Sequence, residues 1–197
     1  MNLKIISNQN QSLTAASIAK QLMEYTTDHR IGAMIDLMKL PDSAQTIAYY
    51  PTLQYDYLAY GLATKSKVSV VQEFAINFDS SYKEALAHLN AEDLLGNIQF
   101  IDTTIDKLIA PESSFDAITL INLYLLFTPK EEEAIHASAL KLVKPGGYLL
   151  FGNTMGMVKS FSAFLTSLGA KHTIIDAHSG MRSSKQPDYA LFRIDSK

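Results

Sequence analysis

The segment Phe115–Leu123, with the sequence FDAITLINL, constrains the fold more than any other part of the chain. Its apolar residues fall on both sides of an extended strand, so a strand here needs a covering layer on each face. Central parallel strands have this pattern, because the helices that connect them lie on both faces of the sheet. The segment therefore predicts an α/β fold with this strand at the centre of the sheet.

The rest of the chain alternates between strand-like and helical patterns. Helical patterns occupy residues 13–25, 31–40, 55–63, 80–95 and 161–168. Strand-like patterns occupy residues 45–50, 67–74, 97–102, 148–152, 173–176 and 189–194. Only a polar loop joins the last two strands, which favours an antiparallel hairpin. The order predicts a doubly wound, mostly parallel, Rossmann-like sheet of seven strands, with N-terminal helices and a C-terminal antiparallel hairpin.

The helix after the central strand has the clearest boundary signals. Thr128 precedes Pro129 and stands three residues before Glu131, which is the pattern of a capping box with proline in the first turn. The KPGG segment, Lys144–Gly147, is expected to end this helix and to lead into the strand 148–152. Gly169 is expected to end the helix 161–168.

The composition indicates one folded domain. Hydrophobic residues make up 47% and charged residues 19% of the 197-residue chain, close to the average for globular proteins. We expect a single domain over 1–197, with an N-terminal helical appendage, 1–40, and an α/β core, 41–197. The chain has no cysteine, which excludes disulfides, thiolate metal sites and cysteine nucleophiles.

Charge and hydropathy argue against several classes of partner. Lys and Arg number 17 and Asp and Glu 20, so the net charge is −3, and no basic cluster offers a broad nucleic-acid surface. The most apolar run, 118–127, is about half as long as a membrane span. The N-terminus lacks the pattern of a secretory signal, and a cytoplasmic location is expected. A homodimer through the N-terminal helices or the open sheet edge is compatible with the sequence.

Two segments carry a family resemblance. Phe115–Leu120 before a helix, and Leu142–Leu150 (LVKPGGYLL) after it, resemble the fourth and fifth strands of class I methyltransferases that use S-adenosylmethionine. The segment 45–153 is similar to the small O-methyltransferases related to catechol O-methyltransferase. The resemblance implies an S-adenosylmethionine-dependent methyltransferase, O-methyltransferase-like, with a small-molecule acceptor.

The first strand and its turn depart from the family pattern. The family places an acid and then a glycine-rich turn, ExGxxxG, against the cofactor, and the corresponding residues here are Ala48, Tyr50 and Gln54. The resemblance implies that Tyr50, Thr52 and Gln54 face the cofactor, but the missing glycines argue against the usual close approach of the backbone. Two hypotheses follow. Either Tyr50 has become part of an active site, or the chain is a catalytically silent methyltransferase-fold protein that acts as a binding or assembly module.

Other strand ends supply polar candidates for the cofactor. Glu73, near the end of the second strand, is placed to accept hydrogen bonds from ribose hydroxyls, with Gln72 as the alternative aligned residue and a solvated surface charge as the plain interpretation. Asp102 and Thr103 follow the third strand, where the family uses an acid and its neighbour near the adenine, although an Asp here equally suits a turn. Asn122, near the end of the fourth strand, is a candidate for orienting a substrate or contacting the cofactor, although a buried Asn on a central strand is also commonly a hydrogen-bonded structural amide.

The sequence gives little indication of a metal site or of a catalytic histidine. The family's metal positions read 121–122 and 152–153 here, and only Asn153 matches, so the sequence predicts no metal site and metal-independent transfer. The five histidines show no ligand or triad spacing and are expected at surface or boundary positions: His29, His88, His136, His172 and His178. His178 is expected in the loop between the last two strands.

Overall fold

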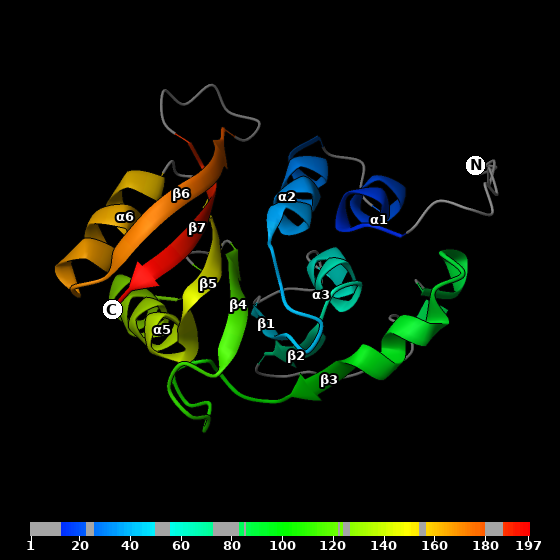
Figure 1. The fold of residues 1–197 in the computed structure, drawn as a ribbon, viewed down its shortest axis with the longest axis horizontal. Helices are drawn as coiled ribbons and strands as arrows, with labels where there is room; N and C mark the ends of the chain where they lie inside the picture. The colour runs from blue at the N-terminus through cyan, green and yellow to red at the C-terminus, as the bar shows by residue number, and fades with distance from the viewer. Residues whose placement is uncertain are drawn as a thin grey trace.

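The computed structural model describes residues 13–22, 26–49, 56–72, 83–84, 86–121, 123, 127–153, 157–179 and 187–197. Its centre is a seven-stranded sheet with the strand order β3-β2-β1-β4-β5-β7-β6 (Figure 1). The strands are β1 (Gln45–Tyr49), β2 (Lys67–Val71), β3 (Ile98–Ile101), β4 (Phe115–Ile121), β5 (Val143–Gly152), β6 (Lys171–His178) and β7 (Tyr189–Ser196). The first five strands are parallel, and β7 is antiparallel to both β5 and β6. The predicted fold class is confirmed, including the position of β4 in the middle of the sheet.

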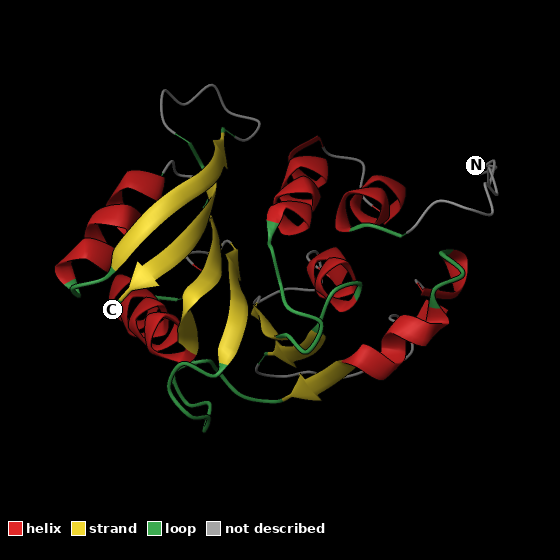
Figure 2. Ribbon diagram, in the orientation of Figure 1, coloured by secondary structure: helices red, strands yellow, loops and turns green. Residues whose placement is uncertain are grey.

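Helices cover both faces of this sheet (Figure 2). On one face lie α1 (Ala15–Leu22), α2 (Thr26–Leu37) and α3 (Asp56–Ala63), and on the other lie α5 (Pro129–Leu142) and α6 (Val158–Ser167). A 3-10 helix, η2 (Glu92–Asn97), precedes β3. Within the described part of the chain, no helix has the length and hydropathy needed to cross a membrane.

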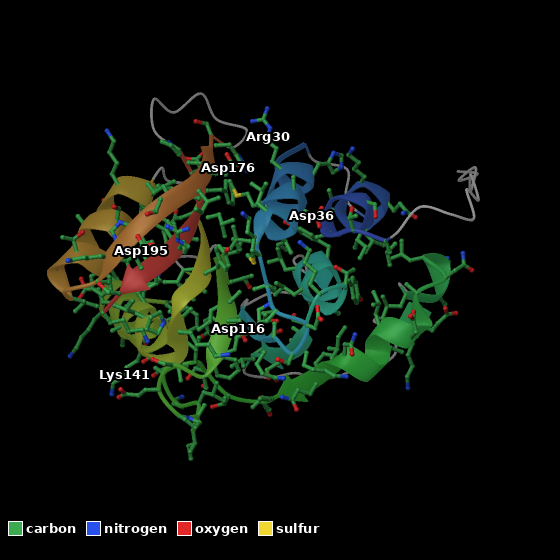
Figure 3. The ribbon with its side chains drawn as sticks, viewed as in Figure 1. Arg30, Asp36, Asp116, Lys141, Asp176 and Asp195 are labelled. Atoms are coloured by element: carbon green, nitrogen blue, oxygen red, sulfur yellow. The ribbon has the colours of Figure 1, made fainter. Side chains whose placement is uncertain are left out.

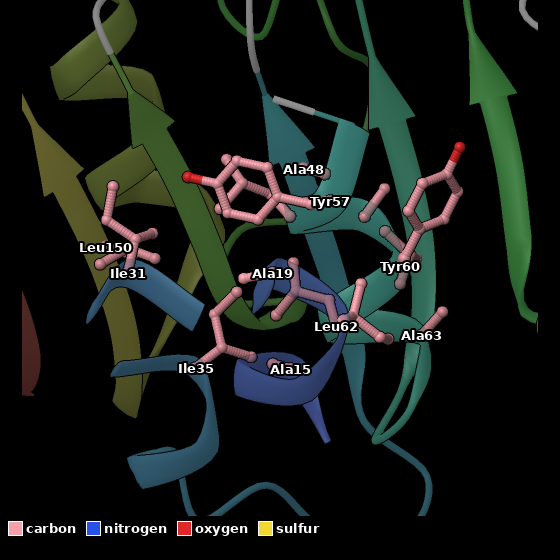
Figure 4. Close-up of a cluster of buried hydrophobic side chains, with 14 of the residues drawn as sticks. Ala15, Ala19, Ile31, Ile35, Ala48, Tyr57, Tyr60, Leu62, Ala63 and Leu150 are labelled. Atoms are coloured by element: carbon pink, nitrogen blue, oxygen red, sulfur yellow. The ribbon is translucent and has the colours of Figure 1, made fainter. Parts of the chain in front are cut away.

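The two-sided burial of β4 follows from the alternation of its side chains. Ala117 and Ile121 belong to the hydrophobic cluster beneath α1, α2 and α3, whereas Ile118 and Leu120 belong to the cluster beneath α5 and α6. All four side chains have no exposed surface. Figure 4 shows part of the first cluster, in which residues of α1, α2 and α3 meet the sheet. Because β4 is apolar on both faces, it contributes to the hydrophobic cluster on each side of the sheet.

Small residues let α1 pack closely against its neighbours. A Cβ atom on Gly32 of α2 would lie 2.8 Å from the carbonyl oxygen of Ala15, and one on Gly61 of α3 would lie 2.8 Å from the Ala15 Cβ. The Asp36 carboxylate accepts hydrogen bonds from the backbone N–H groups of Ala15 at 3.0 Å and Ala16 at 2.9 Å. A side chain of α2 therefore caps the N-terminus of α1, which fixes the two helices relative to each other. The predicted boundaries 13–25 and 31–40 differ from those observed, and α2 begins earlier than expected.

The capping box of α5 is confirmed. Thr128 Oγ1 accepts from the Glu131 N–H, and the Glu131 carboxylate accepts from the Thr128 N–H at 2.8 Å. The Thr128 hydroxyl also donates to the Glu131 carboxylate at 2.7 Å. The hydrogen bonds that this carboxylate accepts from the Thr128 hydroxyl and from the Thr128 N–H lower the pKa of Glu131 below the usual value.

The helix α5 ends just before the KPGG segment, as the sequence predicted, but the segment forms a bulge inside β5 and does not precede the strand. α5 ends at Leu142, and the next residue, Val143, already pairs with Phe115 of β4. The ladder resumes at Tyr148, so the residues between Val143 and Tyr148 form the bulge. Gly146 has φ +81°, which side chains rarely allow, and a Cβ on Gly147 would lie 2.8 Å from the Asp116 carbonyl oxygen.

The predicted helix over 80–95 is wrong in its second half. The helical turn that includes residues 86–88 ends in a turn at Leu89 and Asn90, and Asn90 has φ +51°. A positive φ cannot continue a right-handed helix, and asparagine tolerates it better than most residues. The chain then enters η2 before β3.

Candidate functional site

The candidate site lies at the carboxyl edge of the parallel strands. The strand order reverses between β1 and β4, because the chain builds β2 and β3 to one side of β1 and β4 and β5 to the other. Ligands of open α/β sheets bind outside the carboxyl ends of the strands at such a switch point. A ligand at this edge would meet the carboxyl ends of β1, β2 and β3 on one side of the switch point. On the other side it would meet the carboxyl ends of β4, β5 and β6 and the start of the antiparallel strand β7.

Only part of the predicted cofactor site falls within the described residues. Five predicted residues lie outside them: Tyr50, Thr52, Gln54, Glu73 and Asn122. Asp102 and Thr103 are described, and they follow β3 directly. The Asp102 side chain is exposed, while the Thr103 N–H donates to the Ile101 carbonyl oxygen at 3.0 Å. Both residues thus lie at the carboxyl edge.

Gln72 is the clearest polar feature at the end of β2. Its N–H donates to the Ile101 carbonyl oxygen at 3.1 Å, which places it beside the end of β3. Its side chain is 8% exposed, and Oε1 is buried without a hydrogen-bond partner among the described residues. Thr104 is 5% exposed, and its Oγ1 is likewise buried without a hydrogen-bond partner among the described residues. Buried polar atoms are usually hydrogen-bonded, so each of these atoms needs a partner.

The hydroxyl groups of an adenosine ligand would provide such partners. A ribose hydroxyl donates to an amide oxygen such as Gln72 Oε1, and the Thr104 hydroxyl both donates and accepts. The residues at the ends of β2 and β3 therefore fit a nucleoside. From the sequence, Gln72 is considered only as an alternative to Glu73, and Thr104 is not among the predicted site residues. The run of three consecutive polar residues, Asp102, Thr103 and Thr104, is the signal that could have indicated Thr104.

A transverse row of residues forms the other half of the edge. Ile121 of β4 pairs with Gly152 of β5, Gly152 pairs with Tyr189 of β7, and Tyr189 pairs with His178 of β6. The Tyr189 ring occupies the space above Gly152, since a Cβ there would lie 2.6 Å from the tyrosine Cε1 and 2.7 Å from the Ile121 Cδ1. The absence of a side chain at Gly152 thus allows Tyr189 to lean across β5 toward β4. We call these four residues the edge row.

His178 is the polar end of the edge row. The structure corrects its predicted place in a loop, because it is the last residue of β6. Its ring stacks on that of Tyr189, with ring centroids 5.3 Å apart and an angle of 24° between the ring planes. Burial, opposed mainly by a hydrogen bond to the Ser179 carbonyl, lowers the pKa of His178 below its ordinary value.

Backbone hydrogen bonds hold this end of the sheet together. The Asn153 N–H donates to the Asp188 carbonyl oxygen at 2.8 Å, and the Asp188 N–H donates to the His178 carbonyl oxygen at 3.0 Å. Asn153 and Asp188 are each 1% exposed, and Asn153 Nδ2 donates to the Met157 sulfur at 3.3 Å. Asn153 therefore has a structural role.

The prediction that the histidines lie at surface or boundary positions is wrong for His136. This residue of α5 is 7% exposed and lies edge-on to the rings of Phe151 and Phe161, with centroids 5.6 and 4.9 Å away. Its aromatic neighbours come from β5 and α6, so only the tertiary fold reveals its burial. Across the described ranges, no three His, Cys, Asp or Glu side chains are grouped closely enough to hold a metal ion.

Comparisons with known proteins concern the fold that carries these residues. A family described as a methyltransferase domain matches residues 59–151, from α3 to β5. No match was found among the curated proteins. The structure is similar to the N-methyltransferase NodS from Bradyrhizobium japonicum in complex with S-adenosyl-L-homocysteine, with a TM-score of 0.61, 16% identity, and coverage of 88% of this chain and 89% of that one.

Two further solved structures have the same architecture. A SAM-dependent methyltransferase from Aquifex aeolicus has a TM-score of 0.59 at 12% identity, covering 93% of this chain and 100% of its own. A SAM-dependent O-methyltransferase from Thermotoga maritima has a TM-score of 0.58 at 12% identity, covering 94% and 72% respectively. The fold is that of Rossmann-like methyltransferases. Because the similar structures include both N- and O-methyltransferases, they do not single out the catechol O-methyltransferase type.

Proposed function

We propose that the protein is an S-adenosylmethionine-dependent methyltransferase that acts on the oxygen of a small-molecule acceptor without a bound metal. The observation that carries this proposal is the methyltransferase domain match over 59–151, which includes β2, β3, β4 and all but the last residue of β5. The NodS complex with S-adenosyl-L-homocysteine supports the choice of cofactor. The lack of acidic residues at 121–122 and 152–153 supports transfer without a metal.

In this proposal the chain divides the site between two halves of the sheet edge. Gln72, Asp102, Thr103 and Thr104 hold the nucleoside, together with Glu73 from the segment after β2. Tyr50, Thr52, Gln54 and Asn122 are assigned to the remainder of the cofactor. The bound cofactor supplies an activated methyl group on a sulfonium, so the protein's main task is to position the acceptor and to manage its proton.

Gln72 gives a direct test of the nucleoside half. Gln72→Ala removes an acceptor for a ribose hydroxyl, and a neutral hydrogen bond of this kind contributes about 0.5–1.5 kcal/mol. We therefore expect roughly a 2- to 12-fold weaker affinity for S-adenosylhomocysteine, measured by calorimetric titration. Gln99→Ala is the matched control, because Gln99 on β3 instead donates to Ser69 Oγ within the sheet. Equal affinity in parent and Gln72→Ala would remove Gln72 from the site.

A catalytically silent binding or assembly module remains the second candidate. Ala48 favours it, because this next-to-last residue of β1 is fully buried and offers no carboxylate for the amino group of a methionine moiety. The segment after it has tyrosine and glutamine where the family has glycine. Such a protein would keep the fold but would not bind S-adenosylmethionine.

The proposal that methyl transfer needs no metal ion is tested by chelation. We expect any methyl transfer to proceed at the same rate before and after treatment with a chelator. Loss of transfer on chelation, with recovery on adding magnesium, would contradict this part of the proposal.

A further inference from the structure

His178 has a ring nitrogen whose chemistry the contacts determine. Nδ1 lies 3.2 Å from the Ser179 carbonyl oxygen, and a carbonyl can only accept a hydrogen bond. Nδ1 therefore carries the hydrogen of the neutral ring, and Nε2 carries the lone pair. Nε2 is buried and has no hydrogen-bond partner within the described part of the chain. Buried acceptors are usually hydrogen-bonded, so an unpartnered one requires an explanation. A hydrogen bond from a ligand is one such explanation.

The surroundings keep the ring neutral near neutral pH. Burial is the largest influence and lowers the pKa of His178, and Arg30 of α2 acts in the same direction. The Ser179 carbonyl, Asp176 of β6 and Asp188 before β7 act in the opposite direction. Figure 3 shows Arg30 and Asp176 at the same end of the molecule. A neutral ring with a lone pair on Nε2 can accept a proton.

The position of His178 suits the acceptor rather than the cofactor. The polar residues that fit a nucleoside lie at the ends of β2 and β3, on one side of the switch point. His178 lies on the other side, in the edge row that reaches β4 through Gly152 and Tyr189. Stacking on Tyr189 and the hydrogen bond to Ser179 fix the orientation of the ring.

We propose that His178 is the base of the methyl transfer and that Nε2 takes the proton of an alcohol or phenol acceptor. This inference rests on the proposed function and extends it to the acceptor's chemical class. The acceptor oxygen forms the new bond to the methyl carbon, while the bond from that carbon to sulfur breaks and leaves its electron pair on sulfur. The hydroxyl proton moves to Nε2, and the resulting imidazolium returns it to water after the product leaves. A carboxylate acceptor would need no such base.

The first measurement reads the ring itself. In protein with 15N-labelled histidine, we expect the NMR signals of His178 to show a protonated Nδ1 and an unprotonated Nε2 at pH 7. A His178 ring with hydrogen on Nε2 at pH 7, whether neutral or charged, would overturn the proposal. This measurement needs neither a variant nor an acceptor.

The second measurement reads transfer from labelled S-adenosylmethionine to phenol, catechol and 4-nitrophenol. His178→Gln should lower kcat by about 100- to 10,000-fold and abolish the acid limb of the pH profile, because it removes a general base. The affinity for S-adenosylmethionine should change less than about two-fold. His172→Gln is the control, because the His172 Nε2 lies 2.7 Å from Ser162 Oγ beside α6, away from the edge row.

The outcomes separate the two proposals. If the parent protein does not bind S-adenosylmethionine, the proposed function fails. If it binds the cofactor but methylates none of the three hydroxyl probes, or if His178→Gln keeps both kcat and the pH profile, the role of His178 fails and the cofactor assignment stands.

Discussion

Acidification from pH 7 to pH 4 is expected to remove about 3 kcal/mol of folding free energy through His136 alone. Burial lowers the pKa of this side chain from 6.5 to about 4. The unfolded chain therefore binds a proton below pH 6.5 that the folded chain does not bind until about pH 4. The contribution is fully present above pH 6.5 and is lost as the pH falls through this window.

Glu132 complicates the direct measurement. Its carboxylate lies 3.7 Å from the His136 Nε2, and burial raises the pKa of Glu132 above its usual value. A raised carboxyl pKa has the opposite effect, because the folded state then gains stability as the carboxyl group is protonated. The comparison of interest is therefore between parent and His136→Phe, in which Glu132 is retained and the phenylalanine ring occupies the aromatic cluster.

Urea unfolding of both proteins between pH 7 and pH 4 tests this expectation. The difference in free energy of unfolding, variant minus parent, should rise by about 3 kcal/mol over that range. A difference that stays constant with pH would mean that His136 titrates alike in the folded and unfolded states. His136→Leu gives the same comparison without an aromatic ring.

Gly152→Ala is expected to destabilise the protein by about 1–3 kcal/mol, the usual cost of overpacking a core. The new Cβ would lie 2.6 Å from the Tyr189 Cε1 and 2.7 Å from the Ile121 Cδ1, and both of these residues are buried. The tyrosine ring must then move, and with it the surface on which His178 stacks.

Gly96→Ala is the matched control for this substitution. A Cβ on Gly96 in η2 meets nothing within 4 Å, so its effect on the free energy of unfolding should stay within about 0.5 kcal/mol. Thermal unfolding of the three proteins checks both statements. A Gly152→Ala protein as stable as the parent would show that the edge row has room for a methyl group.

Local signals in the sequence explain which parts of the fold could be predicted. The apolar residues on both faces of β4 and the capping box at Thr128 depend on neighbouring residues only, and both agree with the structure. The KPGG bulge was not predictable, because it depends on Val143 pairing with Phe115 across the sheet. The end of the helical turn before Asn90 also escaped prediction, since the residues around it have no strong helix-breaking signal.

The site shows the same division. Sequence position brought Gln72, Asp102 and Thr103 to strand ends, but it did not indicate that Gln72 is buried while Asp102 is exposed. The edge row depends on the register of four strands, and a shift of one residue would move each side chain to the other face. The sequence alone does not provide that register.

Calorimetric titration of the protein with S-adenosylmethionine tests the central claim most directly. We expect saturable binding, and at a hundred times the dissociation constant the cofactor should raise the free energy of unfolding by about 2.7 kcal/mol. For a chain of this size the melting temperature should then rise by roughly 5–11 °C. The absence of both binding heat and a thermal shift at millimolar cofactor would contradict the methyltransferase assignment and leave the silent binding module in its place.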